Sequence, residues 1–388
     1  MKFKKRQKAI MKRLVKIGYW VVLFFCSFVV LGTLLYFIPL VSDLASNLFM
    51  PLYIPLLVLI LLFVAASAGF LVRKRVLKRA VTFGVSVLTL AAFIFISVFT
   101  VVNVNAQGEK ISYLKLFKIS SYRDVEEQVA YYTDQEGKNV DLSVFYTEDG
   151  TQNKPVIFYT HGGGWITGDR YDRLGTTKTF AQNGYVVVSA DYDLSSEEIN
   201  LYDFTEEQLL CAVKWMRENV KDFGGDIRRL YFVGDSAGGN LALELAYKIN
   251  SGVYENYPQV KAVSVMYPVT DIRAFYENEN LLTSMMCKKM ARSYLGAIPK
   301  DAPVRYEQYN PANFIGSKTP PTLMTLGTSD SSVPPQATYH FAKVLSGIGV
   351  DNQVIKVPFA NHVGDKPVNT FLGQAYVNNT LRWFEQNK

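Results

Sequence analysis

Three long apolar stretches without any charged side chain constrain this chain more than any other feature of its sequence. They occupy residues 17–40, 48–72 and 81–104. Each exceeds the roughly 20 residues that a helix needs to cross about 30 Å of hydrocarbon. Three such stretches in succession are not typical of buried helices in a water-soluble protein, and the first is too long for a cleaved signal peptide. The sequence therefore predicts a membrane region, residues 1–104, with three transmembrane helices.

Basic residues around these stretches predict the orientation of the chain in the membrane. The segment before the first stretch contains eight Lys and Arg residues, the connection at 73–80 contains five, and the connection at 41–47 contains none. Positively charged loops remain in the cytoplasm. We therefore expect a multi-pass protein of the cell membrane with a cytoplasmic N-terminus and an extracytoplasmic domain after residue 104. The three stretches hold no ionisable residue, which argues against a transporter or channel.

The remaining residues, 105–388, have a different composition. They carry 28 Lys and Arg residues against 33 Asp and Glu residues, so the formal net charge of +7 belongs to the first hundred residues. This mildly acidic part gives no indication of a nucleic-acid partner. Cys211 and Cys287 could form one disulfide, although the amphipathic pattern around Cys211 favours a buried free thiol.

The order of predicted elements indicates one α/β domain over residues 121–388, after a linker at 105–120. Two alternating segments form an antiparallel strand pair, and continuous apolar runs then alternate with helices, which is typical of a mostly parallel, doubly wound sheet. An insertion at about 271–320 is expected to form a cap above the carboxyl ends of the strands, where ligands bind. The predicted strands are 125–133, 139–147, 155–160, 185–192, 230–234, 262–268, 322–327 and 352–358.

A Gly-x-Ser-x-Gly motif, "GDSAG" at 234–238, joins a predicted strand to a predicted helix. A sharp turn between strand and helix requires small residues at Gly234 and Gly238 and lifts the intervening side chain above the sheet. The helix also directs its free N–H groups toward the same point, which favours a developing negative charge. This context predicts that Ser236 is a catalytic nucleophile.

The glycine-rich loop "HGGGW", residues 161–165, follows another predicted strand. Consecutive glycines cost backbone entropy and contribute no packing, so their bare N–H groups are expected to approach an anion. Gly163, Gly164 and Ala237 are therefore the predicted oxyanion donors. His161 is expected to support the shape of this loop. Neither the phosphate-loop pattern nor the dinucleotide-binding pattern is present.

A nucleophilic serine needs a base, and the chain contains three histidines. His362 lies in a loop after the last predicted strand, where it can reach a serine at the top of the same sheet, whereas His340 lies within a predicted helix. Asp330 follows the preceding strand and gives the order Ser, Asp, His along the chain. We therefore expect Asp330 to orient His362 and to stabilise its imidazolium form.

From about residue 125 onward, the chain resembles the α/β-hydrolases, in particular the esterases similar to hormone-sensitive lipase. The resemblance rests on "HGGGW", "DYDL" at 191–194, "GDSAGG" at 234–239, "YPVTD" at 267–271, "GTSDSSVP" at 327–334 and His362. It implies a serine carboxylic ester hydrolase with Ser236, Asp330 and His362 as the triad. Two positions depart from the family: Asp193 stands where arginine is common, and Val363 follows the base where glycine is usual.

Together these observations predict a membrane-anchored extracytoplasmic carboxylesterase that forms an acyl-enzyme intermediate. Its substrate is expected to be a small-molecule or cell-envelope ester, with no cofactor and no metal. A serine peptidase or an acyltransferase of the same fold is an alternative, because the same triad serves both. A non-catalytic surface binding module is a further alternative. The natural substrate, the acyl chain length and the oligomeric state stay open.

Overall fold

A computed structural model describes residues 77–118 and 120–388, together with isolated positions among the first 64 residues. The chain divides into two compact units, Met1–Val102 and Asn103–Lys388. The predicted membrane stretch at 81–104 coincides with helix α4 (Leu77–Asn105). Within the described part of the chain, α4 is the one helix long and apolar enough to cross a membrane, over Phe83–Asn105. The predicted spans at 17–40 and 48–72 lie outside the described residues, apart from isolated positions.

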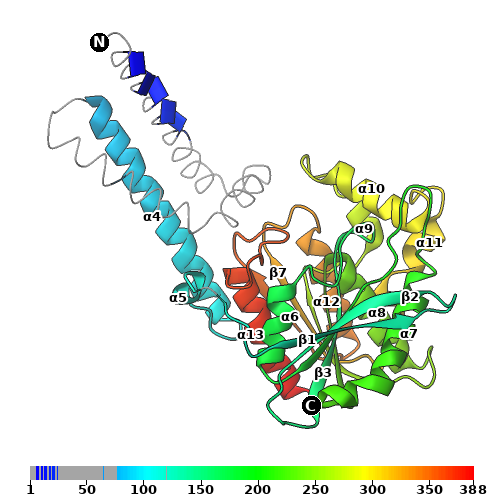
Figure 1. Ribbon diagram of the computed structural model, residues 1–388. Coiled ribbons are helices and arrows are strands. Elements are labelled where there is room, and N and C mark those ends of the chain that lie inside the picture. Colours follow the sequence, from blue (N-terminus) through cyan, green and yellow to red (C-terminus); the bar gives the residue numbers. More distant parts are fainter. Residues whose placement is uncertain are drawn as a thin grey trace. The chain divides into compact units, whose positions relative to one another are not determined.

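The second unit contains an eight-stranded sheet in the order β1-β2-β4-β3-β5-β6-β7-β8 (Figure 1). The pairs β1–β2 and β2–β4 are antiparallel, and all later neighbours are parallel. The predicted mostly parallel sheet, with an antiparallel pair at its start, is thus confirmed. The strands are β1 (Glu126–Thr133), β2 (Asn139–Tyr146), β3 (Lys154–Thr160), β4 (Val186–Ala190), β5 (Gly225–Asp235), β6 (Val260–Met266), β7 (Thr322–Gly327) and β8 (Asn352–Val357).

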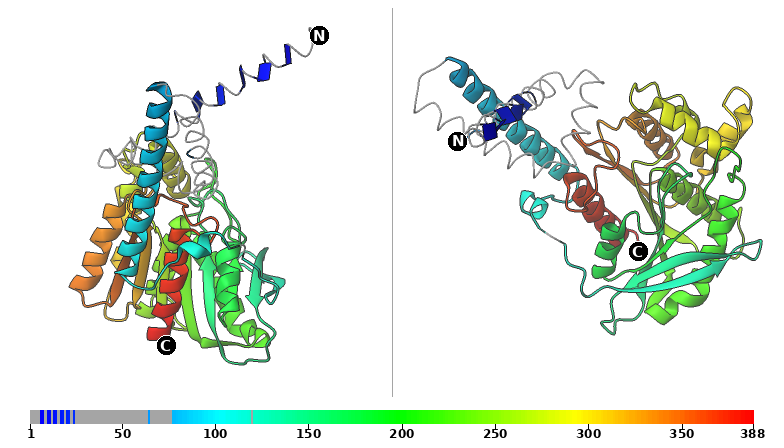
Figure 2. Two further views of the ribbon diagram at one scale, coloured as in Figure 1. Left: turned by 90° about the vertical axis from the view of Figure 1, so that its left-hand side faces the viewer. Right: turned by 45° about the horizontal axis from the view of Figure 1, so that its top comes forward.

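Helices cover both faces of the sheet, which explains why the central strands are continuous apolar runs. Every side chain of β4 and β7 is buried. On one face α6 (Leu174–Gln182) and α13 (Phe371–Gln386) lie side by side (Figure 2). The other face is covered by α7 (Thr205–Asn219), α8 (Ser236–Ser251) and α12 (Pro335–Gly347), where Tyr247 of α8 stacks on Phe341 of α12.

Helix α8 is the most deeply placed of these helices and starts directly at the end of β5. All of its residues up to Asn250 are buried, and it ends at Gly252, whose left-handed φ of 88° closes the helix. Its first turn packs tightly against β3. A Cβ atom at Gly238 would lie 2.2 Å from the carbonyl oxygen of Thr160. The glycine is therefore required by the close approach of strand and helix.

The C-terminal helix α13 is an element that the sequence analysis did not predict. Thr370 caps it by accepting a hydrogen bond from the Gly373 N–H at 3.1 Å. Its apolar side chains recur at helical spacing, so the signal was present in the sequence. The buried members include Phe371, Leu372, Ala375, Tyr376, Trp383 and Phe384.

The segment predicted as a linker, 105–120, contains a short helix, α5 (Tyr113–Leu116), and bonds to the sheet and to α13. The side chain of Gln107 donates to the Lys356 carbonyl and accepts from the Lys356 N–H. The Gln374 side chain pairs in the same way with the backbone of Ser112. These two reciprocal pairs fix the start of the second unit to β8 and α13.

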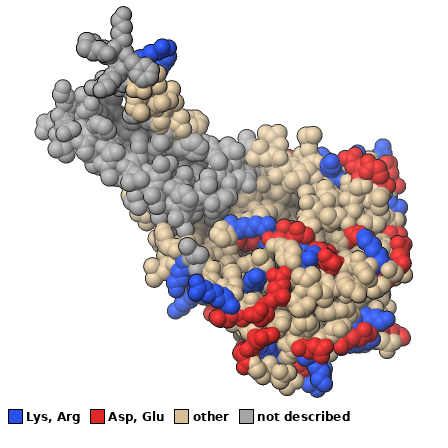
Figure 3. Space-filling view, in the orientation of Figure 1, with Lys and Arg blue, Asp and Glu red and all other residues tan. Residues whose placement is uncertain are grey.

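The predicted cap region, 271–320, lies between β6 and β7 and is mostly helical. It comprises α9 (Ile272–Tyr276), α10 (Ser284–Leu295), α11 (Pro303–Gln308) and the 3₁₀ turn η2 (Pro311–Phe314). Cys287 is buried in α10 and Cys211 lies on α7, and both are free thiols. On the visible face of this unit, acidic and basic side chains are interspersed rather than separated by sign (Figure 3).

Candidate active site

Ser236 lies at the sharp turn where β5 ends and α8 begins. Its backbone has a φ of 53°, in the left-handed region that residues with a side chain rarely adopt. Strained backbone of this kind persists where the surrounding structure enforces it, and it is frequent at functional sites. Only 8% of the residue is exposed. The turn thus presents a nearly buried hydroxyl at the carboxyl end of the central strand.

The structure brings the three predicted triad residues together in one hydrogen-bonded chain. The Ser236 Oγ lies 3.0 Å from His362 Nε2, and His362 Nδ1 lies 2.8 Å from Asp330 Oδ2. Asp330 follows β7 and His362 follows β8, so both side chains reach Ser236 from the same edge of the sheet. Such distances suit transfer of a proton from the serine to the imidazole.

Further hydrogen bonds hold the acid and the base in place. The second carboxylate oxygen of Asp330 accepts from the N–H groups of Ser332 and Val333, at 2.9 and 2.8 Å. The Asn361 side chain accepts from the N–H groups of both His362 and Ser331, at 2.6 and 2.9 Å. Asn361 therefore joins the loop of the base to the loop of the acid. Sequence reasoning missed it, although it directly precedes the histidine.

The glycine loop lies beside the nucleophile and packs against the cap. Gly163 has a φ of 110°, and a Cβ atom there would lie 1.9 Å from the Thr167 carbonyl oxygen. Gly163 and Gly164 line the same cavity as Ser236. Trp165 is buried and stacks on Tyr294 of α10 at 4.6 Å between ring centroids. The two glycines thus lie at the cavity of the nucleophile, where oxyanion donors are required, and their role as donors stays a prediction.

The other two histidines lie elsewhere in the structure. His161 is fully buried, its ring stacks on Tyr192 at 4.1 Å, and its Nδ1 lies 2.8 Å from the Gly162 carbonyl oxygen. Burial lowers the pKa of His161, which keeps its ring neutral. Its contacts agree with the predicted support of the loop. His340 is exposed on α12.

A buried ion network connects the nucleophile turn to the loop of the base. Arg173 contacts Asp235, the residue before the nucleophile, at 2.7 Å, and Asp365, three residues after the base, at 2.9 Å. The Tyr267 hydroxyl donates to Asp365 and the Tyr159 hydroxyl donates to Asp235, at 2.6 and 2.5 Å.

The charges in this network keep the guanidinium ionised. Burial alone would lower the pKa of Arg173, but the surrounding Asp235, Tyr267 and Asp365 hold it well above its ordinary value. The Tyr267 ring also lies 4.4 Å from the imidazole of His362, measured between centroids. The network therefore holds both the turn that carries the nucleophile and the loop that carries the base in position. Neither Arg173 nor Asp365 was predicted, because no local pattern pairs residues so far apart in the chain.

A cavity of about 210 Å³ opens above Ser236 and His362. Met286 and Met290 of α10 and Phe275 of α9 line it on the cap side, and Val363 also lines it. These four side chains are apolar, and the charged residues Asp172, Arg173, Asp235 and Lys366 also line the cavity. The apolar part of this small cavity is suited to a small apolar group.

Two residues that depart from the family pattern have different settings. Asp193 lies outside the cavity lining and forms an ion pair with Lys138 at 2.5 Å. Val363 lines the cavity and has a φ of 59°. The usual glycine adopts this conformation without strain, whereas a β-branched residue does not. The valine is thus held in a strained conformation at the wall of the site.

Comparison with known proteins gives independent evidence on the fold and the family of this chain. The versiconal hemiacetal acetate esterase of Dothistroma septosporum is 40% identical over 108 residues, which cover 28% of this chain and 31% of that protein. Esterase LipQ of Mycobacterium tuberculosis is 26% identical over 243 residues, which cover 57% and 56%. The chain thus spans about a third to about half of the length of these curated relatives.

The solved structure of esterase B from Lactobacillus rhamnosis matches with a TM-score of 0.58 and 21% identity, over 70% of this chain and 89% of that chain. A likeness at this identity establishes the fold, which is that of the α/β-hydrolases. The family model described as BD-FAE matches residues 142–345, from β2 to α12. Because this match extends over more than half of the sequence, the chain belongs to the BD-FAE family.

Proposed function

We propose that this protein is a serine carboxylic ester hydrolase. The observation that carries the proposal is the continuous hydrogen-bonded chain from Asp330 through His362 to Ser236, located at the floor of a cavity. The relatives named as esterases, although aligned over only part of their length, support the same reaction class. Nucleophile, acid and base follow one another along the chain in the order expected for this fold.

In the acylation step, Ser236 Oγ attacks the ester carbonyl carbon and transfers its proton to His362 Nε2. The carbonyl oxygen becomes an oxyanion, which the N–H groups of Gly163, Gly164 and Ala237 stabilise. The C–O bond to the alcohol then breaks, and His362 gives its proton to the departing alkoxide oxygen. The products of this step are the free alcohol and an acyl group on Ser236.

In the deacylation step, a water molecule attacks the acyl carbon and gives a proton to His362 Nε2. The second tetrahedral intermediate uses the same oxyanion donors. Its collapse releases the carboxylic acid and returns the proton to Ser236 Oγ. Throughout, Asp330 holds the Nδ1–H of the imidazole and stabilises its positive charge.

The acyl group of the substrate is short in this proposal. The cavity holds about 210 Å³ and is closed on the cap side by Met286, Met290 and Phe275. A chain of a few carbons fits this space, whereas a fatty acyl chain would need the cap to move. We therefore expect acetyl to butyryl esters to be preferred over long-chain esters.

Three membrane spans, at 17–40, 48–72 and 81–104, anchor the enzyme in this proposal, with the N-terminus in the cytoplasm and the catalytic domain outside. Support comes from the length of the three uncharged stretches and from the basic residues at 1–16 and 73–80. The apolar helix Phe83–Asn105 agrees with the third span. Such an enzyme would act on small esters or on acylated envelope components at the cell surface.

The activity is tested with full-length protein in detergent micelles and a series of p-nitrophenyl esters from acetate to palmitate. We expect Ser236→Ala to lower kcat by about 10⁴-fold or more and Asp330→Asn by about 10³–10⁴-fold. A fluorophosphonate probe should label Ser236, as mass spectrometry of the labelled peptide would show. Unchanged turnover in a folded Ser236→Ala variant would refute the proposal.

Assays on the same full-length protein distinguish an esterase from a peptidase or an acyltransferase of the same fold. A peptidase would cleave a matched p-nitroanilide as efficiently as the ester, and an acyltransferase would form a new ester when an alcohol acceptor is added. Product analysis by mass spectrometry separates the three outcomes. For the topology, a reporter fused after residue 104 that is active only outside the cytoplasm should be active, and an inactive fusion contradicts the orientation.

A further inference from the structure

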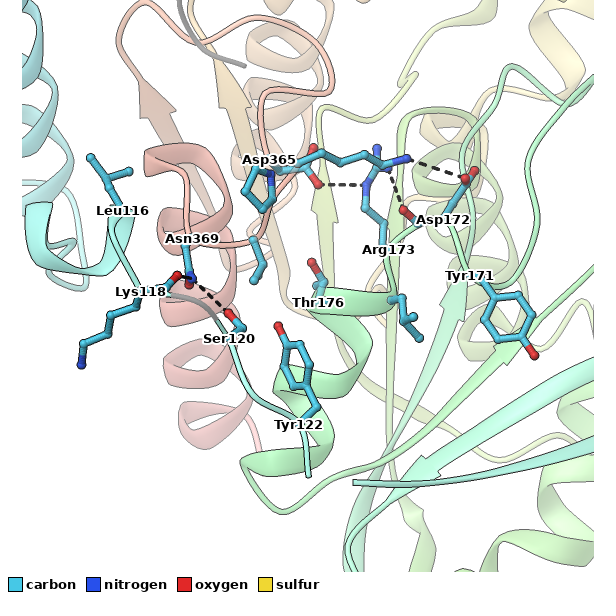
Figure 4. A pocket seen from close by; sticks show the side chains of 15 residues that line it. Leu116, Lys118, Ser120, Tyr122, Tyr171, Asp172, Arg173, Thr176, Asp365 and Asn369 are labelled. Carbon is cyan, nitrogen blue, oxygen red and sulfur yellow. Dashed lines mark hydrogen bonds and ion pairs between the residues drawn. The ribbon is translucent and has the colours of Figure 1, made fainter. Parts of the chain in front are cut away.

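Figure 4 shows a second cavity, of about 510 Å³, which shares lining residues with the one that contains Ser236. Three parts of the second unit form it: Leu116, Lys118, Ser120 and Tyr122 before β1, the start of α6, and the loop that follows His362. In Figure 4, Tyr122 and Thr176 point into the space between Asn369 and Arg173. No step of the proposed mechanism uses this cavity, although it is more than twice as large as the catalytic one.

The two cavities share part of their walls. Asp172, Arg173 and Lys366 line both of them. Arg173 is held by two buried carboxylates, but Lys366 and Asp172 form a looser ion pair at 3.7 Å, and the lysine side chain is 49% exposed. An exposed pair of this kind contributes little stability, so its side chains can move apart when a ligand extends from one cavity to the other.

The chemistry of ester cleavage indicates which half of a substrate would extend in this direction. The departing alkoxide oxygen must receive its proton from His362 Nε2, so the alcohol half has to lie on the side of the base. The second cavity is lined by Asp365, Lys366, Pro367, Val368 and Asn369, which follow the base in the chain. The acyl half is then left to the smaller cavity, which Met286 and Met290 line.

From this arrangement we propose that the second cavity binds the alcohol half of the substrate, an inference that rests on the proposed ester hydrolysis. The catalytic cavity is too small to hold both halves of any but the smallest esters. Most of the exposed wall surface of the second cavity is apolar. Ser120 and Asn369 bond to each other at 3.0 Å, and the other polar and charged members of the lining are Lys118, Asp172, Arg173, Thr176, Asp365 and Lys366. The lining fits a bulky ring-bearing alcohol with an apolar body; its apolar members are Leu116, Tyr122, Leu174, Pro367 and Val368.

Gly175 offers a way to fill this cavity without touching the catalytic residues. It lies in the first turn of α6, and a Cβ atom there would lie 3.4 Å from both Tyr122 Oη and Val368 Cγ1, which is ordinary contact. Its φ lies outside the left-handed region. Gly175→Ala is therefore tolerated and leaves most of the cavity open, whereas Gly175→Leu extends a side chain into it. The alanine variant is the matched control.

The assay compares phenyl acetate with 4-biphenylyl acetate, using the full-length protein in detergent micelles. The two esters share the acetyl group and have leaving phenols of similar acidity, so they differ mainly in the size of the alcohol half. We expect Gly175→Leu to lower kcat/KM for the biphenylyl ester by about tenfold or more relative to phenyl acetate, the scale at which a pocket discriminates by size. In Gly175→Ala the ratio of the two kcat/KM values should stay within about twofold of the wild-type ratio.

An unchanged ratio in a folded Gly175→Leu protein would overturn the proposal, as would an equal loss on both esters. If the leucine variant does not fold, Val368→Trp fills the same cavity from the opposite wall and is read in the same way. Failure of the proposed function gives a different result, since the wild-type protein would then show no Ser236-dependent hydrolysis of phenyl acetate.

Discussion

Replacement of Arg173 by methionine removes the guanidinium that lies between two buried carboxylates. The Arg173 side chain is 5% exposed, and those of Asp235 and Asp365 are 4% and 1% exposed. Methionine keeps much of the volume, so the cavity contribution to the free energy of unfolding is small. The change therefore leaves two buried negative charges without their cation.

Removal of one partner from a buried ion pair costs about 3–5 kcal/mol of stability. Here Tyr159 and Tyr267 continue to donate hydrogen bonds to the two carboxylates, which argues against a larger loss. We therefore expect a loss of about 4 kcal/mol, measured by urea unfolding of the full-length protein in micelles with intrinsic fluorescence. The urea midpoint should fall by about 1–2 M, and kcat should fall as well, because Asp235 and Asp365 adjoin the nucleophile and the loop of the base.

Two further variants decide whether the charges cause this loss. Arg173→Met combined with Asp365→Asn should be more stable than Arg173→Met alone, because one unpaired charge is removed. Arg228 forms an exposed ion pair with Asp226 and serves as a surface control, in which Arg228→Met should change nothing measurable. A loss below about 1 kcal/mol in Arg173→Met would refute the reasoning.

Two other positions give separate predictions. Burial, together with the charge of Glu206, raises the pKa of Glu244 from its ordinary value of 4.5 to about 7. Between about pH 4.5 and 7, the native state therefore keeps a proton that the unfolded chain has already lost. Stability should fall by up to about 3 kcal/mol as the pH rises through this window, and Glu244→Gln should flatten the dependence in thermal unfolding; an unchanged slope would contradict this. Val363→Gly should remove backbone strain of about 1–3 kcal/mol and raise the ratio of hexanoate to acetate hydrolysis. Val253→Gly, at an exposed position with ordinary φ, should instead lower the melting temperature, and an equal loss in both variants would count against strain at Val363.

The architecture of the second unit could be predicted because its signals are local. Buried parallel strands are continuous apolar runs, and all eight strands lie where such runs or alternating segments were found. The candidate triad could be assembled because Ser236, Asp330 and His362 each follow a predicted strand, and the ends of parallel strands meet at one edge of a sheet. Their catalytic roles stay a prediction until the variants are measured.

The residues that sequence reasoning missed depend on contacts between distant segments. Arg173 pairs with Asp235 and Asp365, which lie 62 and 192 positions later, and no spacing rule connects them. The reciprocal bonds of Gln107 with Lys356 and of Gln374 with Ser112 are of the same kind, since each joins the predicted linker to a segment more than 200 residues later in the chain. Helix α13 is different, because its apolar periodicity could have been recognised from the sequence.

Recognition of the substrate depends on segments outside the strand ends. Val363 lines the smaller cavity, which contains Ser236, and Gly175 lines the cavity assigned to the alcohol half. If the halves of the ester occupy separate cavities, Val363→Gly should change the acyl-length ratio alone and Gly175→Leu the leaving-group ratio alone. Substitutions without shared contacts are additive in free energy, so the double variant should show the product of the two rate effects. Strong coupling between them would instead indicate that both halves of the ester share the smaller cavity.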